Sequence, residues 1–168
     1  SDRGGNWDIF VMPAAGGKAV QITSDPSHEL HPSWSPDGTS LVFSRLGEQS
    51  GQWELWVVDV TNTNVTHAIG HGLFPEWCPM PGTGLDGADQ ILFQRPRERG
   101  DRNFAVWTID YANGNVGSPT ELAASTDEAF VNPTWSPDGT QIVFASISKP
   151  NDRSDPDLVE ADLWMMET

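Results

Sequence analysis

Short runs of apolar residues alternate with turn residues along this chain, and no segment repeats its apolar positions at the spacing of a helix. Three runs, SLVFSR at 40–45, QILFQR at 90–95 and QIVFAS at 141–146, are rich in β-branched and aromatic residues, as strands are. Each run follows a turn signal that contains glycine. Before the first and third runs this signal is Pro-Asp-Gly. The pattern predicts an all-β protein with almost no helix.

These turns and strands belong to an internal repeat. The frame Pro-x-Trp-Ser-Pro occurs at 32–36 and 133–137, and a middle copy at 75–79 carries Cys78 in place of the serine. From the Trp of the frame to the Phe of the next strand, the spacing is nine residues in the first and third copies and sixteen in the middle copy. The middle copy is therefore expected to have a longer turn.

Two further elements recur between the copies of the frame. One is a strand centred on an aromatic residue, and the other is a shorter apolar segment after it. The aromatic-centred strands lie at 6–13, 53–60, 104–111 and 161–168, and the shorter segments at 18–24, 64–70 and 119–125. Four short strands per repeat of about 40 to 60 residues, in tandem, are typical of a β-propeller with four-stranded antiparallel blades.

The repeat resembles a known family. Trp-Ser-Pro-Asp-Gly with its following apolar strand, then SDRGGN at 1–6 and DIFVM at 8–12, are similar to the TolB-type β-propeller repeat. The resemblance covers nearly the whole chain. It implies that the Pro-x-Trp strand is the first of each blade and lies near the propeller axis, and that the shorter segment is the fourth and outermost strand.

Under that scheme the chain contains about three blades and one further strand. We expect a half blade at 1–30, complete blades at 31–70 and 71–125, and an incomplete blade at 126–168. Propellers close with about four to eight blades, and the resemblance implies about six. The chain is therefore expected to be part of a larger ring, completed by further blades of the same polypeptide or by a second protomer.

Charge and cysteine content exclude several classes of protein. With 24 acidic and 9 basic residues, the net charge of -15 argues against general affinity for nucleic acid, which needs clustered Lys and Arg. No apolar run approaches the roughly 18 residues of a membrane span. A single cysteine excludes an internal disulfide and a zinc site built from several cysteines.

The histidines are candidate metal ligands. His28 and His71 each lie six residues before the Trp of a frame, and His31 lies three before it. Equivalent positions of successive blades face the same end of a propeller, so these imidazoles could converge on a divalent metal or a substrate. The alternative is that they are surface histidines with no shared ligand. No other cofactor is predicted.

Two charged loops are candidate partner-binding sites. Arg95, Arg97 and Arg99 form a local basic cluster, whose guanidinium groups suit a partner's carboxylates. Asp155 and Asp157 belong to the acidic segment 151–162, which we expect to form a long loop of the kind that often carries recognition. The alternatives are local charge balance for the arginines and a solvated insertion for the acidic segment.

The resemblance implies a non-catalytic propeller that binds protein partners in the bacterial periplasm or outside the cell. Two enzyme alternatives remain open. The chain could be the propeller domain of a prolyl oligopeptidase-type serine peptidase, although it contains no Gly-x-Ser-x-Gly nucleophile elbow. It could also be a metal-dependent lyase built around the histidines. No catalytic set of residues is readable from the sequence, and we therefore expect a binding protein.

Overall fold

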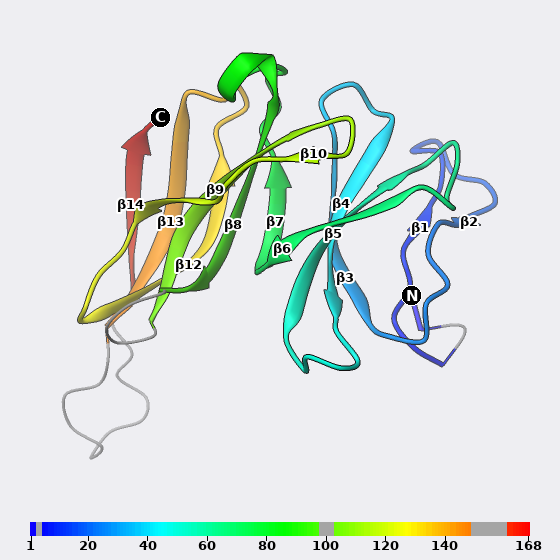
Figure 1. The fold of residues 1–168 in the computed structure, drawn as a ribbon, viewed down its shortest axis with the longest axis horizontal. Coiled ribbons are helices and arrows are strands. Elements are labelled where there is room, and N and C mark those ends of the chain that lie inside the picture. The colour runs from blue at the N-terminus through cyan, green and yellow to red at the C-terminus, as the bar shows by residue number, and fades with distance from the viewer. Residues whose placement is uncertain (3–4, 98–102, 149–160) are drawn as a thin grey trace. The chain divides into compact units, whose positions relative to one another are not determined.

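A computed structural model describes residues 1–2, 5–97, 103–148 and 161–168, and within them it contains fourteen strands and one 3-10 helix of three residues (Figure 1). Every described strand pair is antiparallel. The prediction of an all-β protein is confirmed. The chain divides into two units, Ser1–Pro75 and Glu76–Thr168, which are described separately.

The first unit contains a two-stranded and a four-stranded sheet. Strand β1 (Phe10–Val11) pairs with β2 (Val20–Gln21). The four-stranded sheet runs in chain order through β3 (Glu29–Trp34), β4 (Ser40–Leu46), β5 (Trp53–Asp59) and β6 (Thr66–His71). These strands alternate in direction and are joined by short connections, as the repeat predicts.

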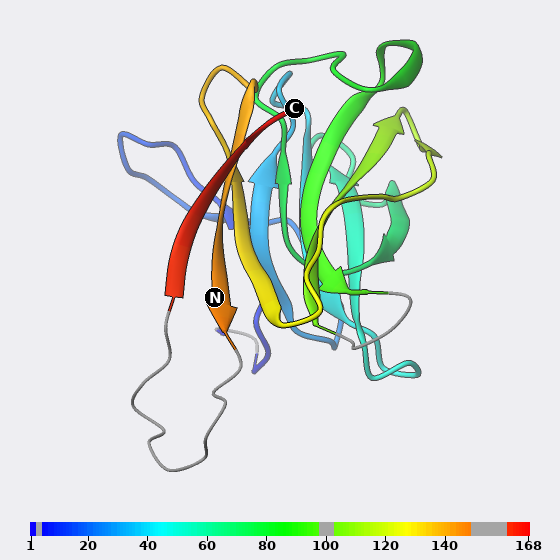
Figure 2. The ribbon, with the colours of Figure 1, turned by 90° about the vertical axis from the view of Figure 1, so that its left-hand side faces the viewer.

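The second unit contains a five-stranded and a three-stranded sheet. The larger sheet is built from β7 (Leu73–Trp77), which crosses the unit boundary, β8 (Asp89–Pro96) and β9 (Phe104–Ala112), with β10 (Asn115–Val116) and β11 (Thr120–Ala123) both paired to β9. The 3-10 helix Leu85–Gly87 lies in the long turn before β8. The smaller sheet contains β12 (Glu128–Trp135), β13 (Gln141–Ser148) and β14 (Ala161–Glu167), with β14 at its edge (Figure 2).

Two short strands, β10 and β11, pair with the outer edge of β9, where the sequence predicted one. Asn113 and Gly114 both have positive φ, at 50° and 88°. This is the geometry of a tight hairpin turn of the Asn-Gly type, and it joins β9 to β10. The chain then bends at Gly117, whose backbone N–H donates to the carbonyl of Asp110 at 2.8 Å, before β11 pairs further along β9.

The Ser-Pro-Asp-Gly turns are held by their own side chains. Ser35 Oγ donates to Asp37 Oδ1 at 2.6 Å and accepts the backbone N–H of Ser40 at 2.9 Å. The backbone N–H of Thr39 also donates to Asp37, at 3.0 Å. Hydrogen bonds from the Ser35 hydroxyl and from Thr39 hold the pKa of Asp37 below its ordinary value. The same bonds recur around Asp138, so the turn is one structural unit used twice.

Each first strand contains a backbone irregularity at the residue before its proline. His31, Phe74 and Asn132 have φ of 56°, 52° and 50°. The pairing register of the strand shifts at this point in β3 and in β12, so both strands have a bulge there. A residue before proline normally adopts an extended conformation. The left-handed conformation was not predicted, and it places these three side chains at equivalent positions.

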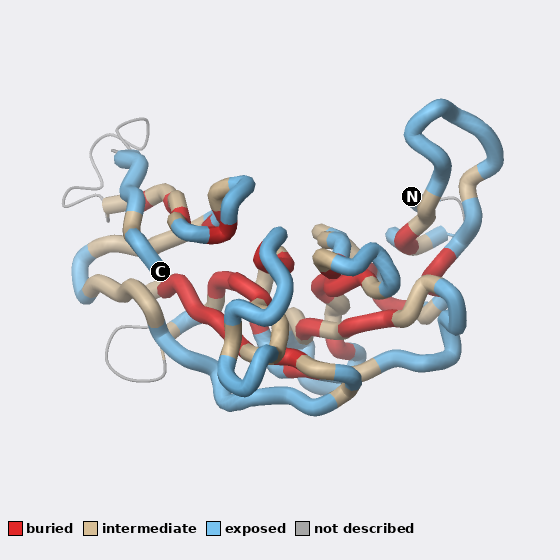
Figure 3. Tube along the Cα trace, turned by 90° about the horizontal axis from the view of Figure 1, so that it is seen from above, coloured by how far each residue is buried: buried red, intermediate tan, exposed pale blue. Residues whose placement is uncertain are grey.

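The core of each unit lies between two of its sheets. In the second unit, Cys78, Leu92 and Val106 of the larger sheet cluster with side chains of the smaller one, which are Trp135, Ile142 and Phe144. In the first unit, Ile9 and Ile22 beside β1 and β2 cluster with Leu41, Phe43 and Val58. Figure 3 shows these buried stretches within the strands and the exposed residues mainly in the connections. Packing of sheet on sheet, with aromatic and branched side chains, therefore forms the core.

Two glycines at the same place in the repeated turn provide a test of this packing. Gly38 and Gly139 have φ of 71° and 68°, but a Cβ on Gly38 would meet nothing within 4 Å, whereas one on Gly139 would lie 2.9 Å from Cys78 Sγ. We expect Gly38→Ala to cost about 1–2 kcal/mol for the left-handed backbone. Gly139→Ala should cost about 1–3 kcal/mol more because of overpacking. Denaturant unfolding measures both, and equal losses would contradict the described contact.

Candidate functional site

The three histidines proposed as metal ligands make separate contacts. The backbone N–H of Trp7 donates to His28 Nδ1 at 3.2 Å. The ring of His31 lies against that of Phe74 with centroids 4.0 Å apart and planes tilted by 39°, and burial lowers the pKa of His31. His71 is exposed at the end of β6. Within the described residues, no three His, Cys, Asp or Glu side chains are placed to hold a metal ion. Metal binding by these histidines stays a prediction.

The basic cluster is described in part. The guanidinium carbon of Arg95 lies 3.8 Å from the centroid of the Trp107 ring. Arg97 Nη1 donates to the carbonyl of Ser125 at 3.4 Å, and its Nε lies 4.0 Å from a carboxylate oxygen of Glu121. Arg99, Asp155 and Asp157 lie outside the described residues, so their proposed role in partner binding is not addressed by the geometry.

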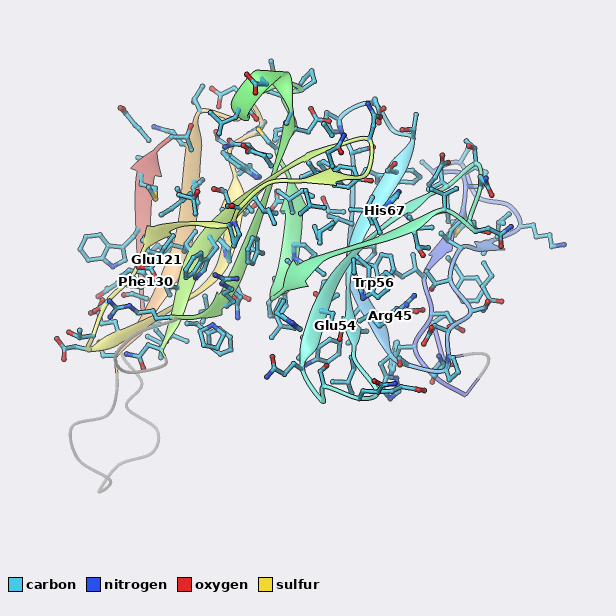
Figure 4. The ribbon with its side chains drawn as sticks, viewed as in Figure 1. Arg45, Glu54, Trp56, His67, Glu121 and Phe130 are labelled. Atoms are coloured by element: carbon cyan, nitrogen blue, oxygen red, sulfur yellow. The ribbon has the colours of Figure 1, made fainter. Side chains whose placement is uncertain are left out.

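A guanidinium on a tryptophan also occurs in the first unit. The guanidinium carbon of Arg45 lies 4.4 Å from the centroid of Trp56, whose indole N–H donates to Glu54 Oε2 at 3.1 Å (Figure 4). Arg45 and Arg95 both lie two residues after the Phe of the second strand, and Trp56 and Trp107 lie opposite those Phe residues. The repeat thus places a cation on an aromatic face twice, an arrangement that stabilises the pairing of β4 with β5 and of β8 with β9.

Arg45 also belongs to a buried ionic cluster that the sequence analysis did not identify. Its Nη2 lies 3.0 Å from Oε1 of Glu29, and its Nη1 lies 3.4 Å from Oδ2 of Asp25. The Glu29 side chain is fully buried, and this burial raises its pKa. The only sequence signal was an acidic residue three positions before the Pro-x-Trp frame, and such a residue alone predicts no partner.

Asparagines clamp the connections between successive sheets. Asn6 Nδ2 donates to the carbonyls of Asp25 and Ser27 at 2.6 and 2.8 Å. In the second unit, Asn103 Nδ2 donates to the carbonyl of Thr126 at 3.0 Å. Asp25 and Thr126 both lie nine residues before the Trp of the next frame. The same hydrogen bond therefore occurs in both units, and Asn6 and Asn103 have a structural role.

Acidic side chains gather at one end of the sheets. Successive turns of an antiparallel sheet alternate between its two ends, so the first-to-second and third-to-fourth turns share one end. Of the Lys and Arg side chains that the structure describes, only Lys18 lies in such a turn. The aspartates there are Asp37 and Asp59 in the first unit, and Asp86, Asp89, Asp110 and Asp138 in the second. We call each of these two sets the acidic end of its unit.

Backbone hydrogen bonds hold several of these carboxylates in place. Asp89 Oδ1 accepts the N–H of Gly82 at 2.8 Å, and Asp110 Oδ2 accepts the N–H of Leu85 at 3.1 Å. The hydroxyl and the backbone N–H of Thr61 both donate to Asp59 at 2.7 Å, which lowers the pKa of that carboxyl. Turn geometry therefore holds several of these carboxylates in place, and hydrogen bonds from their turns lower the pKa of Asp37, Asp59 and Asp138.

Two apolar surfaces are exposed where equivalent residues are buried. On β14, Leu163 and Met165 are 80% and 63% exposed, whereas Val106 and Thr108, at the equivalent positions of β9, are buried. In the first unit, Trp34 is 47% exposed, although the Trp residues of the other two frames are at most 7% exposed. Trp34 borders an apolar cavity of about 230 Å³. Such surfaces mark sites where another polypeptide segment can pack.

Comparison with known proteins agrees with the repeat and the sheets. The family model for the TolB β-propeller domain matches residues 1–162. The chain belongs to this family. A region of 79 residues is 37% identical to the Tol-Pal system protein TolB of Zymomonas mobilis, covering 46% of this chain and 17% of that protein. The TolB β-propeller assignment of the repeat is therefore confirmed.

Solved structures show the same fold. The chain is similar to a TolB of Agrobacterium tumefaciens, with a TM-score of 0.72 at 21% identity, over 98% of this chain and 54% of that one. It is also similar to an acylaminoacyl peptidase of Pyrococcus horikoshii, with a TM-score of 0.55 at 13% identity, over 84% of this chain and 23% of that one. The TolB-like chain spans 16–32% of the curated relatives that it matches.

No helix in the described part of the TolB-like chain has the length and apolar character needed to cross a membrane.

The buried ion pair of the TolB-like chain has a measurable consequence. We expect Arg45→Met to destabilise the fold by about 3–5 kcal/mol, because it leaves the carboxylate of Glu29 buried without its cation. The matched change Arg97→Met, at a half-exposed pair, should cost at most about 1 kcal/mol. Denaturant unfolding at neutral pH measures both variants, and a smaller loss for Arg45→Met than for Arg97→Met would contradict the buried pair.

The pH dependence of the same variant follows from the pKa of Glu29. Burial raises this pKa above its ordinary value of 4.5, so the folded state favours the protonated form. This preference stabilises the folded state at pH values below the ordinary pKa. The stabilisation is lost as the pH rises through the pKa that Glu29 has in the folded state. Removing Arg45 raises that pKa further. The loss caused by Arg45→Met should therefore shrink in mildly acidic solution, and Glu29→Gln should restore part of it at neutral pH.

Proposed function

We propose that this chain is part of a non-catalytic TolB-like β-propeller that serves as a protein-interaction scaffold in the bacterial cell envelope. Membership of the TolB β-propeller family supports the proposal, as do the names of several relatives, which assign them to a Tol-Pal system. The partner that these names suggest is a Pal protein, and the proposed location is the periplasm.

The acidic end is the observation that carries this proposal. Several of its carboxylates accept hydrogen bonds from backbone or hydroxyl groups of their turns, so the positions of these carboxylates are held before any partner arrives. Preorganised charge of one sign speeds encounter with a surface of opposite sign and rejects partners of the same sign. We therefore propose that the acidic end of each unit contacts a basic surface of the partner.

We further propose that the four sheets belong to a ring of about six blades. Under this proposal, residues 1–30 form a half blade, residues 31–70 and 71–125 form complete blades, and residues 126–168 form an incomplete one. Support comes from the exposed Trp34 and Leu163, whose equivalents elsewhere in the chain are buried against a neighbouring sheet. The likeness to 54% of a TolB chain points the same way.

The propeller domain of a larger peptidase is a second candidate. The likeness to the Pyrococcus acylaminoacyl peptidase favours it, although at 13% identity that likeness concerns the fold alone. A peptidase would need a nucleophile and its base on another domain. Hydrolysis of peptide substrates by the polypeptide that contains this chain, and its loss when a serine of such a domain is changed, would favour the peptidase over the scaffold.

The acidic end can be tested by removing charge without removing the turns. Asp59→Asn and Asp86→Asn keep an oxygen acceptor, and asparagine tolerates the left-handed backbone of Asp86, which has φ of 55°. We expect the double variant to bind the Pal protein of the same organism about tenfold more weakly at low salt, with most of the change in the association rate. Surface plasmon resonance over a salt series measures both.

Glu48→Gln is the matched control, because it removes one negative charge from an exposed loop at the opposite end of the same sheet. It should leave Pal binding unchanged. An equal loss for this control would show that net charge, and not the acidic end, governs binding. A loss confined to Arg97→Gln would place the interface at the basic cluster instead and contradict the proposed surface.

A further inference from the structure

The turn of the middle frame copy contains seven more residues than the turns of the other two copies. The backbone hydrogen bond that closes each hairpin encloses residues 36–39 in the first copy, 137–140 in the third and 79–89 in the middle one. Four residues therefore suffice to join the two strands. Figure 1 shows the middle turn, in green with its 3-10 helix, beyond the ends of β7 and β8. The added residues form a projection that the hairpin itself does not need.

Hydrogen bonds fix the backbone of this projection. The backbone N–H of Gly84 donates to the carbonyl of Ala88 at 2.8 Å, and the N–H of Ala88 donates to the carbonyl of Leu85 at 3.0 Å. The carboxylate of Asp110 on β9 accepts the N–H of Leu85 at 3.1 Å. A Cβ on Gly84 would lie 2.5 Å from the same carboxylate, so the backbone of the turn lies directly against it. The projection is therefore attached to the sheet at Leu85.

The projection carries a large apolar side chain into solvent. Leu85 is 80% exposed, and the next two residues, Asp86 and Gly87, have φ of 55° and 77°. A single exposed leucine is common on protein surfaces. This leucine differs because its backbone is already hydrogen-bonded to the sheet. A partner that covers it orders little additional chain and loses little binding free energy to conformational entropy.

The charges around Leu85 are of one sign. Asp86 is exposed and adjacent to it, and Asp89 and Asp110 accept backbone hydrogen bonds from the same turn. The Lys and Arg side chains that the structure describes in the second unit are Arg95 and Arg97, and both lie at the opposite end of β8. The complementary surface is therefore an apolar pocket with basic residues at its rim.

We propose that Leu85 anchors a protein partner to the acidic end of the second unit by entering an apolar pocket whose rim carries Lys or Arg. The rim meets the carboxylate of Asp86, and the attachment to Asp110 holds the leucine in place. The inference rests on the proposed function and deepens it, because it names the residue that retains the partner after charge has steered it. Charge acts mainly on association, whereas a buried apolar anchor acts mainly on dissociation.

Surface plasmon resonance with the intact chain and the Pal protein of the same organism tests the anchor. We expect Leu85→Ser to raise the dissociation rate about tenfold, at low and at high salt, with little change in association. Leu85→Met keeps an apolar side chain of similar size and should dissociate as the parent chain does. Val20→Ser is the matched control, because Val20 is 59% exposed but lies on β2 of the first unit. It should leave the dissociation rate unchanged.

Gly84→Ala tests the attachment of the turn while leaving Leu85 and every charge in place. The backbone φ of Gly84 is -87°, which alanine adopts, but its Cβ would displace the turn from Asp110. We expect faster dissociation than for the parent chain, by less than for Leu85→Ser. An unchanged rate would overturn the role of the attachment. Unfolding in urea should be the same for Leu85→Ser and the parent chain, because the side chain is exposed.

The remaining outcomes separate this inference from the proposed function. An unchanged dissociation rate for Leu85→Ser, or an equal increase for Val20→Ser, would overturn the anchor. The salt-dependent loss of association in the Asp59→Asn and Asp86→Asn variant would then still support the proposed function. Absence of Pal binding by the parent chain would overturn both.

Discussion

Each sheet of this chain carries apolar side chains on both faces, and such a sheet is buried only where another sheet lies against each face. In β13, Ile142 and Phe144 face the larger sheet of the second unit and are buried with Val106. The residues that alternate with them lie on the opposite face, with Leu163 and Met165 beside them on β14, and there both β14 residues are exposed. This alternation follows from the two-residue period of a strand. It determines which faces of the sheets are covered by another sheet and which remain exposed for a partner.

Polar contacts specify how the sheets follow one another, while the apolar faces supply the burial. Asn6 and Asn103 bind the carbonyls of equivalent connections, and Arg45 neutralises the fully buried carboxylate of Glu29. A buried ion pair of this kind adds little net stability compared with an apolar contact, but an unpaired carboxylate there is costly. The pair therefore favours the observed register of β3 and β4, in which Glu29 and Arg45 lie opposite each other, since a shifted Glu29 would lose its cation.

The sequence predicted the strands and the turns because their causes are local. Two-residue alternation, the Pro-Asp-Gly turns and the recurrent Trp all act within a few residues, and the sheets follow them closely. The left-handed backbone of Phe74 was not predicted, because the preference before proline is extended. The cavity was not predictable either, since Trp34 and Trp135 share one sequence frame and differ only in which strand lies over them. The ring of His31 meets Phe74, which is distant in the sequence, and no spacing rule reveals that contact.

The fold alone does not separate a binding scaffold from a peptidase propeller, since both types of chain match it. The scaffold proposal draws on two surfaces that differ in their physics. The acidic end offers charges held by turns, which act at a distance and weaken as salt increases. The apolar side chains that line the cavity beside Trp34 act only on contact, so a partner packed on them would depend little on salt.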